Sequence, residues 1–313
     1  MSLVTQGGWT PVQIAGKALE WLWGRKKPII VVVALVGVVK IRQHLKRKER
    51  RRKWNEAGKD VVVLHMFQRG LTCPSPSPSI LKLETYLRIA EIPYQIDHEE
   101  PMGKKGKCPW ITVNGEDVAD SQLIMEYLGP KFRKDLSSHL TAEEKAVAHS
   151  MQIMVDEYFL WCLMVWSYVQ ERGRPLLKCV YIPVPFRFMI HMFAKRFEKA
   201  TLVQGIGRHS FREVEEMGRK CLLSPLCSVG CLQTFPFSLF LTTSGQNPFM
   251  MGDKATELDC SVFGMLAQVM WCSPNSAYLR MLESDYRNLY DYCIPYMKKF
   301  YPDWDKCLDK RRQ

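Results

Sequence analysis

Two residues whose side chains could take part in chemistry follow a predicted buried strand, residues 61–67. They lie in the stretch TCPSPSPSI. Cys73 lies before a predicted helix, and a thiol near a helix N-terminus becomes reactive because its pKa falls. No second cysteine follows two residues on, and two prolines separate Cys73 from the helix, so we expect it to lie out in the loop without a catalytic role. Ser77 stands directly before Pro78, the arrangement typical of an N-cap and a first helical residue.

The cysteines as a group predict no metal centre. The chain has eleven cysteines but no C-x-x-C pair, and the two that lie nearest in sequence, Cys227 and Cys231, have no histidine pair beside them. No N-glycosylation acceptor is present, so a reducing, cytosol-facing compartment with buried thiols is indicated. Dinucleotide, P-loop, G-x-S-x-G and H-E-x-x-H motifs are absent, and His65, inside the first strand, is expected to be a core residue.

The elements around this turn predict a thioredoxin-like α/β domain over residues 59–130. A strand, a helix and a second strand are followed by a hairpin, with Asn114-Gly115 as its two-residue turn, and by a closing helix. The expected ranges are 61–67, 80–90, 94–96, 108–113, 116–119 and 120–128. Ser121 opens the closing helix, where its hydroxyl and the first N–H groups suit either a plain N-cap or a bound carboxylate.

Residues 141–304 are predicted to be all-helical. Three helices open on a capping box, in which a hydroxyl and an acid three residues later satisfy each other's backbone N–H groups. These boxes are Thr141/Glu144, Ser210/Glu213 and Thr256/Asp259. We expect the last of them to open a buried helix, where its role is folding and not catalysis.

A run of 32 uncharged residues, 221–252, interrupts this half. A membrane span is weakened by Pro225 and Pro236, and a metal site by the cysteine spacing. We interpret residues 221–245 as an aberrant insert, either an alternative exon or an error in the gene model.

Three N-terminal segments precede the predicted domains. Residues 1–27 form an amphipathic segment, 28–41 a candidate membrane-anchor helix and 42–58 a basic linker. The uncharged core of the anchor, residues 28–39, is twelve residues long, short of the roughly 20 that cross a bilayer, but lysines at both ends can snorkel. A buried or surface helix, and a nuclear-localisation or nucleic-acid segment in KRKERRRK, are the alternatives.

The net charge of +12 is concentrated near the N-terminus. Residues 25–53 carry twelve lysines and arginines and one acid, so the remainder is nearly neutral and no nucleic-acid partner is expected. Nine of the twelve follow residue 39, so a single-pass anchor would place the C-terminal domain in the cytosol. Residues 28–53 are therefore expected to bind membrane lipid, at the mitochondrial outer membrane or the endoplasmic reticulum.

Four stretches together resemble one protein family: SPSILKLETYLRIAEIPYQ, GKCPWITVNGEDVADSQLIMEYL, QGIGRHS and FMMGDKATELDCSVFGMLAQVMW. They resemble the failed axon connections family, which is related to metaxins and to glutathione transferases, over roughly residues 60–304. The resemblance implies a thioredoxin-like domain followed by a glutathione transferase-like helical domain. It also implies that Thr256 and Asp259 form the structural capping box of that helical domain.

The resemblance further implies positions for a glutathione site. Ser77 corresponds to the group that activates the glutathione thiol, and Pro109 to a cis-proline whose neighbour, Cys108, would pair with the cysteinyl part through its backbone. Asp120 and Ser121 match the pair that holds the γ-glutamyl end.

Two functions follow from this resemblance. The favoured one is a membrane-anchored, non-catalytic protein that acts through an unidentified protein partner in axon development, with homodimerisation left open. The alternative is a glutathione-dependent transferase that uses Ser77 to stabilise the thiolate, with glutathione as its only implied cofactor and no metal.

Overall fold

The computed structural model describes residues 33, 35–223 and 248–311, and the chain divides into two units, Met1–Ala57 and Gly58–Gln313. In the first unit, residues 35–55 form one helix, so most of the segment expected to be a linker is helical. The amphipathic segment 1–27 and much of the candidate anchor 28–41 lie outside the described residues. Among the helices that are described, none combines the length and the apolar character that a membrane crossing needs.

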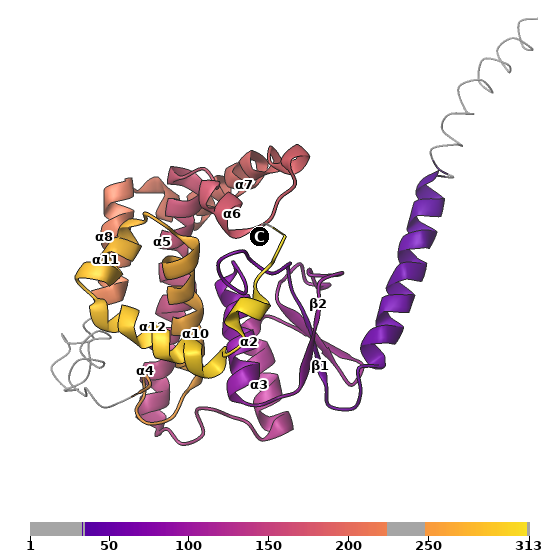
Figure 1. The fold of residues 1–313 in the computed structure, drawn as a ribbon, viewed down its shortest axis with the longest axis horizontal. Coiled ribbons are helices and arrows are strands. Elements are labelled where there is room, and N and C mark those ends of the chain that lie inside the picture. The colour runs from indigo at the N-terminus through magenta and orange to yellow at the C-terminus, as the bar shows by residue number, and fades with distance from the viewer. Residues whose placement is uncertain (1–32, 34, 224–247, 312–313) are drawn as a thin grey trace, which may run out of the picture. The chain divides into compact units, whose positions relative to one another are not determined.

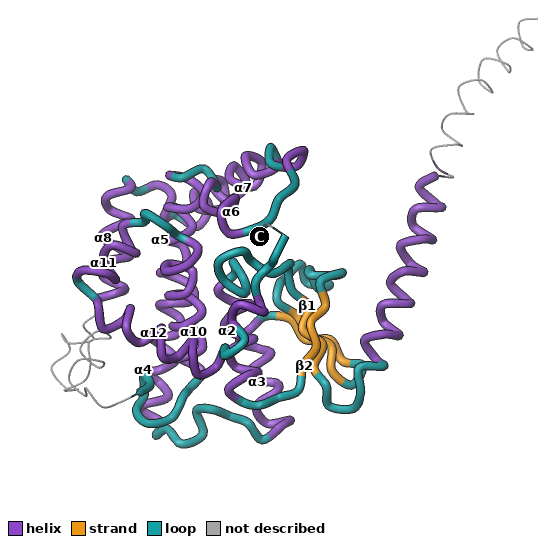
Figure 2. Tube along the Cα trace, in the orientation of Figure 1, coloured by secondary structure: helices purple, strands orange, loops and turns teal. Residues whose placement is uncertain are grey.

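The second unit contains one sheet, drawn in orange in Figure 2. It has four strands in the order β2-β1-β3-β4. The strands are β1 (Val62–His65), β2 (Tyr94–Asp97), β3 (Trp110–Val113) and β4 (Glu116–Ala119). β1 pairs parallel with β2, while β3 pairs antiparallel with both β1 and β4. This order is that of the predicted thioredoxin-like sheet.

The predicted hairpin turn is confirmed. β3 and β4 pair Val113 with Glu116 across the turn, and the two turn residues, Asn114 and Gly115, have φ of 49° and 85°. A two-residue turn that matches the twist of the strands needs positive φ at both positions, which Asn and Gly tolerate best.

Two helices cover the sheet, α2 (Pro78–Ile89) and α3 (Ser121–Phe132). The apolar positions that predict α2 recur at steps of three and four, and all of them are buried against the strands. These positions are Ile80, Leu83, Leu87 and Ala90. His65 is also buried, between Asp97 and Thr112 with its ring stacked on Trp110, so its predicted role in the core is confirmed.

The rest of the unit is helical (Figure 1). The α-helices are α4 (Ala142–Ile153), α5 (Leu160–Met164), α6 (Arg174–Cys179), α7 (Met189–Gln204), α8 (Phe211–Leu223), α10 (Glu257–Ala267), α11 (Ala277–Ser284) and α12 (Arg287–Phe300). π-helical turns cover Met154–Phe159, Val165–Gln170 and Gln268–Cys272, and 3-10 turns cover Val184–Phe186, Ile206–Arg208 and Trp304–Cys307. The predicted all-α half and its three capping boxes are confirmed.

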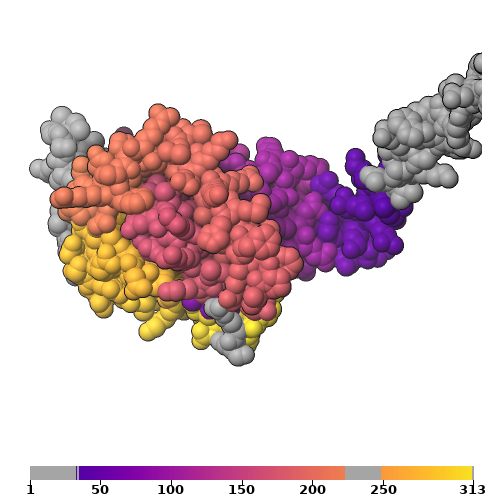
Figure 3. Space-filling model, turned by 90° about the horizontal axis from the view of Figure 1, so that it is seen from above, coloured from indigo at the N-terminus to yellow at the C-terminus, as the bar shows by residue number. Residues whose placement is uncertain are grey.

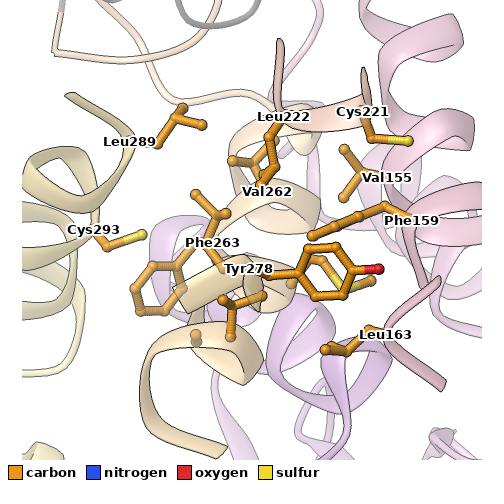
Figure 4. Packing of buried hydrophobic residues seen from close by; sticks show 14 of the residues in the cluster. Val155, Phe159, Leu163, Cys221, Leu222, Val262, Phe263, Tyr278, Leu289 and Cys293 are labelled. Carbon is orange, nitrogen blue, oxygen red and sulfur yellow. The ribbon is translucent and has the colours of Figure 1, made fainter. Parts of the chain in front are cut away.

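A second core lies among these helices, as Figure 4 shows. Phe159 and Tyr278 meet edge to face with ring centroids 5.4 Å apart, and Val262 and Phe263 of α10 lie in the same cluster. Cys221 and Leu222 are buried there as well, so the first residues of the segment interpreted as an insert continue α8. The rest of that segment, from residue 224, is outside the described residues.

The two predicted domains are packed closely through α2 and α10. Gly264 of α10 allows this approach, because a Cβ atom there would lie 2.8 Å from the carbonyl oxygen of Pro78. The contact explains why the sheet half and the helical half form one unit. It also fixes the start of α2 against the helical half.

Candidate functional site

Ser77 is the N-cap of α2, with Pro78 at the first helical position, as the sequence predicts. Its side chain, however, makes no capping hydrogen bond. Its backbone N–H instead donates to the hydroxyl of Ser75, at 3.2 Å. The half-buried Ser77 hydroxyl therefore contributes no capping energy, although it lies where a ligand-binding group is expected.

Cys73 lies in the loop before α2, as the sequence predicts, but its side chain is fully buried and does not extend out into solvent. The turn that carries it is tied to the end of α6, because the N–H of Leu71 donates to the carbonyl of Cys179 at 2.7 Å. The thiol belongs to the core of the helical half, together with Cys179 and Cys272. Loop position and exposure are separate properties, and the sequence indicates only the first.

The Cys108-Pro109 peptide bond is cis, as the resemblance implies. Burial raises the pKa of the Cys108 thiol to about 11, and the thiol is protonated at neutral pH. Cys108 can therefore offer a ligand its backbone, but not a thiolate. The carbonyl of Pro109 accepts a hydrogen bond from the N–H of Asp120, at 3.3 Å, which brings these two predicted positions together.

Asp120 and Ser121 lie at the start of α3, as expected, but the cap is Asp120 rather than Ser121. The Asp120 carboxylate accepts from the N–H of Gln122 at 3.2 Å and lies 3.7 Å from the Lys107 ammonium. Its backbone has φ of 88° and ψ of 125°, a conformation that costs energy outside glycine and often marks ligand sites. Ser121 is the first helical residue, half-buried beside this carboxylate.

A buried polar network that the sequence does not reveal lies next to these residues. The ammonium of Lys82, whose side chain is 2% exposed, donates to Asp156 at 2.6 Å and to the amide oxygen of Gln122 at 3.0 Å. The Ser261 hydroxyl donates to the same Asp156 oxygen at 3.2 Å, and Gln152 donates to the Gln122 oxygen. The network joins the sheet half, through α2 and α3, to the helical half, through Gln152, Asp156 and Ser261.

An apolar pocket of about 60 Å³ lies beside the start of α2. Pro76 and Pro78 line it from one side, and Leu163, Tyr168 and Cys272 are among the residues that line it from the other. Ser77, between the two prolines, is not part of its lining. The pocket and the Ser77 hydroxyl are therefore neighbours along the chain without sharing one cavity.

Two family models match the chain. One describes a glutathione S-transferase N-terminal domain and matches residues 78–173, and the other describes a glutathione S-transferase C-terminal domain and matches residues 234–294. The second match begins inside the segment interpreted as an insert.

Similar whole proteins point the same way. The chain is 32% identical to Failed axon connections of Drosophila melanogaster over 80% of its own length, and spans 61% of the length of that protein. The chain is a homologue of Failed axon connections. It is also 25% identical to an isoprene-epoxide glutathione S-transferase of a Rhodococcus strain, over 67% of this chain and 87% of that one. Metaxin-2 of Mus musculus is 24% identical over 74% of this chain and 85% of the relative.

Among solved structures, the glutathione transferase GSTFuA3 of Phanerochaete chrysosporium superposes with a TM-score of 0.51 at 13% identity, over 76% of this chain and 97% of that one. This likeness concerns the fold alone. The predicted fold, a thioredoxin-like sheet followed by a glutathione transferase helical domain, is thus confirmed for this homologue of Failed axon connections.

Proposed function

We propose that this homologue of Failed axon connections is a non-catalytic protein that acts through protein interactions, held at a membrane by residues 28–53, and that its role lies in axon development. The observation that carries the non-catalytic part is the state of Ser77. Its hydroxyl makes no capping bond and does not line the neighbouring pocket. A group that activates a thiol has to be oriented toward its ligand, and no contact of this side chain provides that orientation.

The start of α3 supports the same proposal. A helix N-terminus attracts anions through its free N–H groups. Here the carboxylate of Asp120 already accepts from Gln122, and the same carboxylate is already close to Lys107. A tripeptide would have to compete with these internal partners for both its carboxylate and its amino group.

The alternative is a glutathione-dependent transferase that uses Ser77 to stabilise the thiolate. The position of Asp120 and Ser121 at the start of α3 and the cis peptide bond at Cys108-Pro109 favour it, since both match what the resemblance implies for a glutathione site. In that case Cys108 and Pro109 hold the cysteinyl part, and Asp120 and Ser121 hold the γ-glutamyl end.

Steady-state assays separate the two functions. The full chain is mixed with glutathione and a set of electrophilic acceptors, next to Ser77→Ala and Ser121→Ala variants. The proposal predicts the same rate for all three proteins, equal to the reaction without protein. A rate above that level which falls in both variants would establish the transferase.

The membrane part of the proposal rests on charge and hydropathy. Residues 28–39 are uncharged, and residues 40–53 contain nine lysines and arginines, which attract anionic lipid. A fluorescent reporter fused to residues 1–55 should remain with membranes after alkaline extraction, at the mitochondrial outer membrane or the endoplasmic reticulum. A reporter found free in the cytosol would refute the anchor.

The protein partner is sought by cross-linking the full chain in cells, with homodimers as one product to look for. A nucleic acid as the main cross-linked product would contradict the proposed mode of action.

A further inference from the structure

Large apolar side chains are exposed in a row before and along α7. In the short turn Val184–Phe186, Val184 is 72% and Phe186 is 54% exposed. Phe188 follows at 62%, and Met192 on the first turn of α7 reaches 65%. We call residues 183–199 the α7 face. Single exposed apolar residues are normal, but a contiguous set of this kind marks a surface that meets something else.

The inner side of α7 is occupied, which leaves these residues outside. Ile190 and Ala194 are buried, and Phe197 stacks on Tyr168 with ring centroids 4.2 Å apart. Met192 points away from these positions, because two residues turn an α-helix by about 200° from Ile190. α7 therefore packs one side on the protein and leaves Met192 exposed on the other. Figure 1 shows this helix at the edge of the helical half.

The same region is strongly basic. Residues 172–199 contain seven lysines and arginines and one acid, Glu198. In the part of the chain that the structure describes, none of these seven cations forms a salt bridge. Residues outside 25–53 have almost no net charge in total, so acids elsewhere in the chain offset this basic cluster.

We propose that the α7 face docks on an anionic membrane surface. Exposed aromatic and methionine side chains can enter the boundary between head groups and acyl chains, while the flanking cations pair with lipid phosphates and carboxylates. A nucleic acid would use the cations, but it offers no apolar medium for Val184 or Met192. Figure 3 looks onto this side of the molecule, where the α7 region forms much of the visible surface.

This contact is separate from the anchor proposed at residues 28–53. It belongs to the folded unit Gly58–Gln313 and does not require the N-terminal helix. The two contacts therefore have to be measured independently.

The first experiment tests the charges. The full chain is sedimented with vesicles of phosphatidylcholine, with or without phosphatidylserine. The variant Arg187→Gln/Lys195→Gln/Arg196→Gln should bind the anionic vesicles about 100-fold more weakly than the native chain. Each lost charge accounts for about a fivefold loss, which corresponds to about 1 kcal/mol. A variant with the same three changes elsewhere, Lys145→Gln/Lys254→Gln/Lys298→Gln, should bind like the native chain.

The second experiment tests the apolar side chains. Phe188→Ser/Met192→Ser should weaken binding by about tenfold or more, since each side chain loses burial in the lipid boundary. Leu123→Ser/Phe211→Ser is the matched control, because these residues are 50% and 49% exposed on other helices. All four side chains are exposed, so the thermal midpoints of both variants should stay near that of the native chain. Equal binding by both variants would overturn the proposal.

Hydrogen exchange on the vesicle-bound full chain separates the two contacts. Slowed exchange at residues 183–199 supports the docking surface, whether or not residues 28–53 are slowed as well. Slowed exchange at 28–53 alone overturns it and leaves the anchor standing. Slowed exchange at 183–199 with single-stranded RNA, but not with anionic vesicles, also overturns it and makes the α7 face a nucleic-acid surface.

Discussion

The starts of α2 and α10 look alike in the sequence and differ in the structure. Each begins with a hydroxyl residue that predicts an N-cap. At α10, the N–H and the hydroxyl of Thr256 both donate to the Asp259 carboxylate, at 2.8 and 2.7 Å. This carboxylate also accepts from the N–H of Met250 at 2.7 Å and the hydroxyl of Tyr292 at 2.8 Å. At α2, the Ser77 hydroxyl makes no capping bond.

The difference follows from burial. Thr256 and Asp259 are fully buried, where a polar group without a partner costs free energy. The N–H and hydroxyl of Thr256 and both carboxylate oxygens of Asp259 are accordingly bonded within the protein. Ser77 is half-buried, and water can satisfy the N–H groups near it. A buried residue whose polar groups are all bonded within the protein, such as Asp259, is therefore required for folding. Ser77, whose hydroxyl makes no capping bond, can be replaced without loss of a hydrogen bond that the fold needs.

The largest effect is expected at Asp259. Asp259→Ala leaves the N–H of Met250, the N–H and hydroxyl of Thr256, and the hydroxyl of Tyr292 without their acceptor, and should cost about 3–5 kcal/mol of unfolding free energy. Urea unfolding of the full chain measures it. The exposed acid Asp253 provides the control, as Asp253→Ala should unfold near the native midpoint. An unshifted midpoint for Asp259→Ala would show that the hydrogen bonds at the start of α10 do not stabilise the fold, and the two helix starts would then not differ.

Thr256 comes next. Thr256→Ala removes the hydroxyl but keeps Asp259 and its other partners, so we expect a loss of about 1–2 kcal/mol. Thr256→Ser keeps the hydroxyl and should recover most of that loss. If alanine and serine gave equal stability, the hydrogen bond from the threonine hydroxyl would carry no energy.

A smaller, pH-dependent effect is expected where α2 ends. The hydrogen bond from Arg88, 2.6 Å long, lowers the pKa of Asp303 to about 2, below its ordinary value of 3.8. Because the pKa is lower in the folded chain, the carboxylate stabilises the fold above about pH 4, and this contribution is lost as the pH falls toward 2.

Unfolding free energy measured from pH 5 to pH 2 should therefore fall less steeply for Asp303→Asn than for the native chain. Asp305→Asn, a neighbouring exposed acid, is the control and should keep the native slope. Parallel curves for all three proteins would mean that the C-terminal turn does not hold the end of α2.

The smallest effect is expected at Ser77. Ser77→Ala removes a hydroxyl without a capping bond and should change the unfolding free energy by less than about 0.5 kcal/mol. Thermal unfolding beside Thr256→Ala gives the direct contrast. A loss as large as that of Thr256→Ala would show that Ser77 caps α2 in solution and that the two helix starts are equivalent.

Local patterns predict much of this fold. The Asn114-Gly115 turn and the three capping boxes depend on residues a few positions apart, so their chemistry can be read along the chain. The positions of Ser77, Pro109 and Asp120 follow from the resemblance, and the structure brings Pro109 and Asp120 into hydrogen-bond contact.

Contacts between segments that lie far apart in the sequence cannot be predicted from local patterns. Glu84 is of a residue type that is mostly exposed, yet it is buried and bonded by Arg69 through both of its carboxylate oxygens, at 2.7 and 2.8 Å. Lys82 is likewise buried because Asp156, far along the chain, lies beside it. The basic α7 face was concealed in a net charge near zero. Each of these depends on which segments the fold brings together.

Glutathione titrated into the full chain tests the central claim most directly. Isothermal titration, with the shift of the thermal midpoint as a second readout, compares the native chain with Ser121→Ala. If the chain is a non-catalytic interaction protein, both proteins should show no heat of binding and no shift at millimolar glutathione. Saturable binding by the native chain that is lost in Ser121→Ala would contradict the account and identify a working glutathione site.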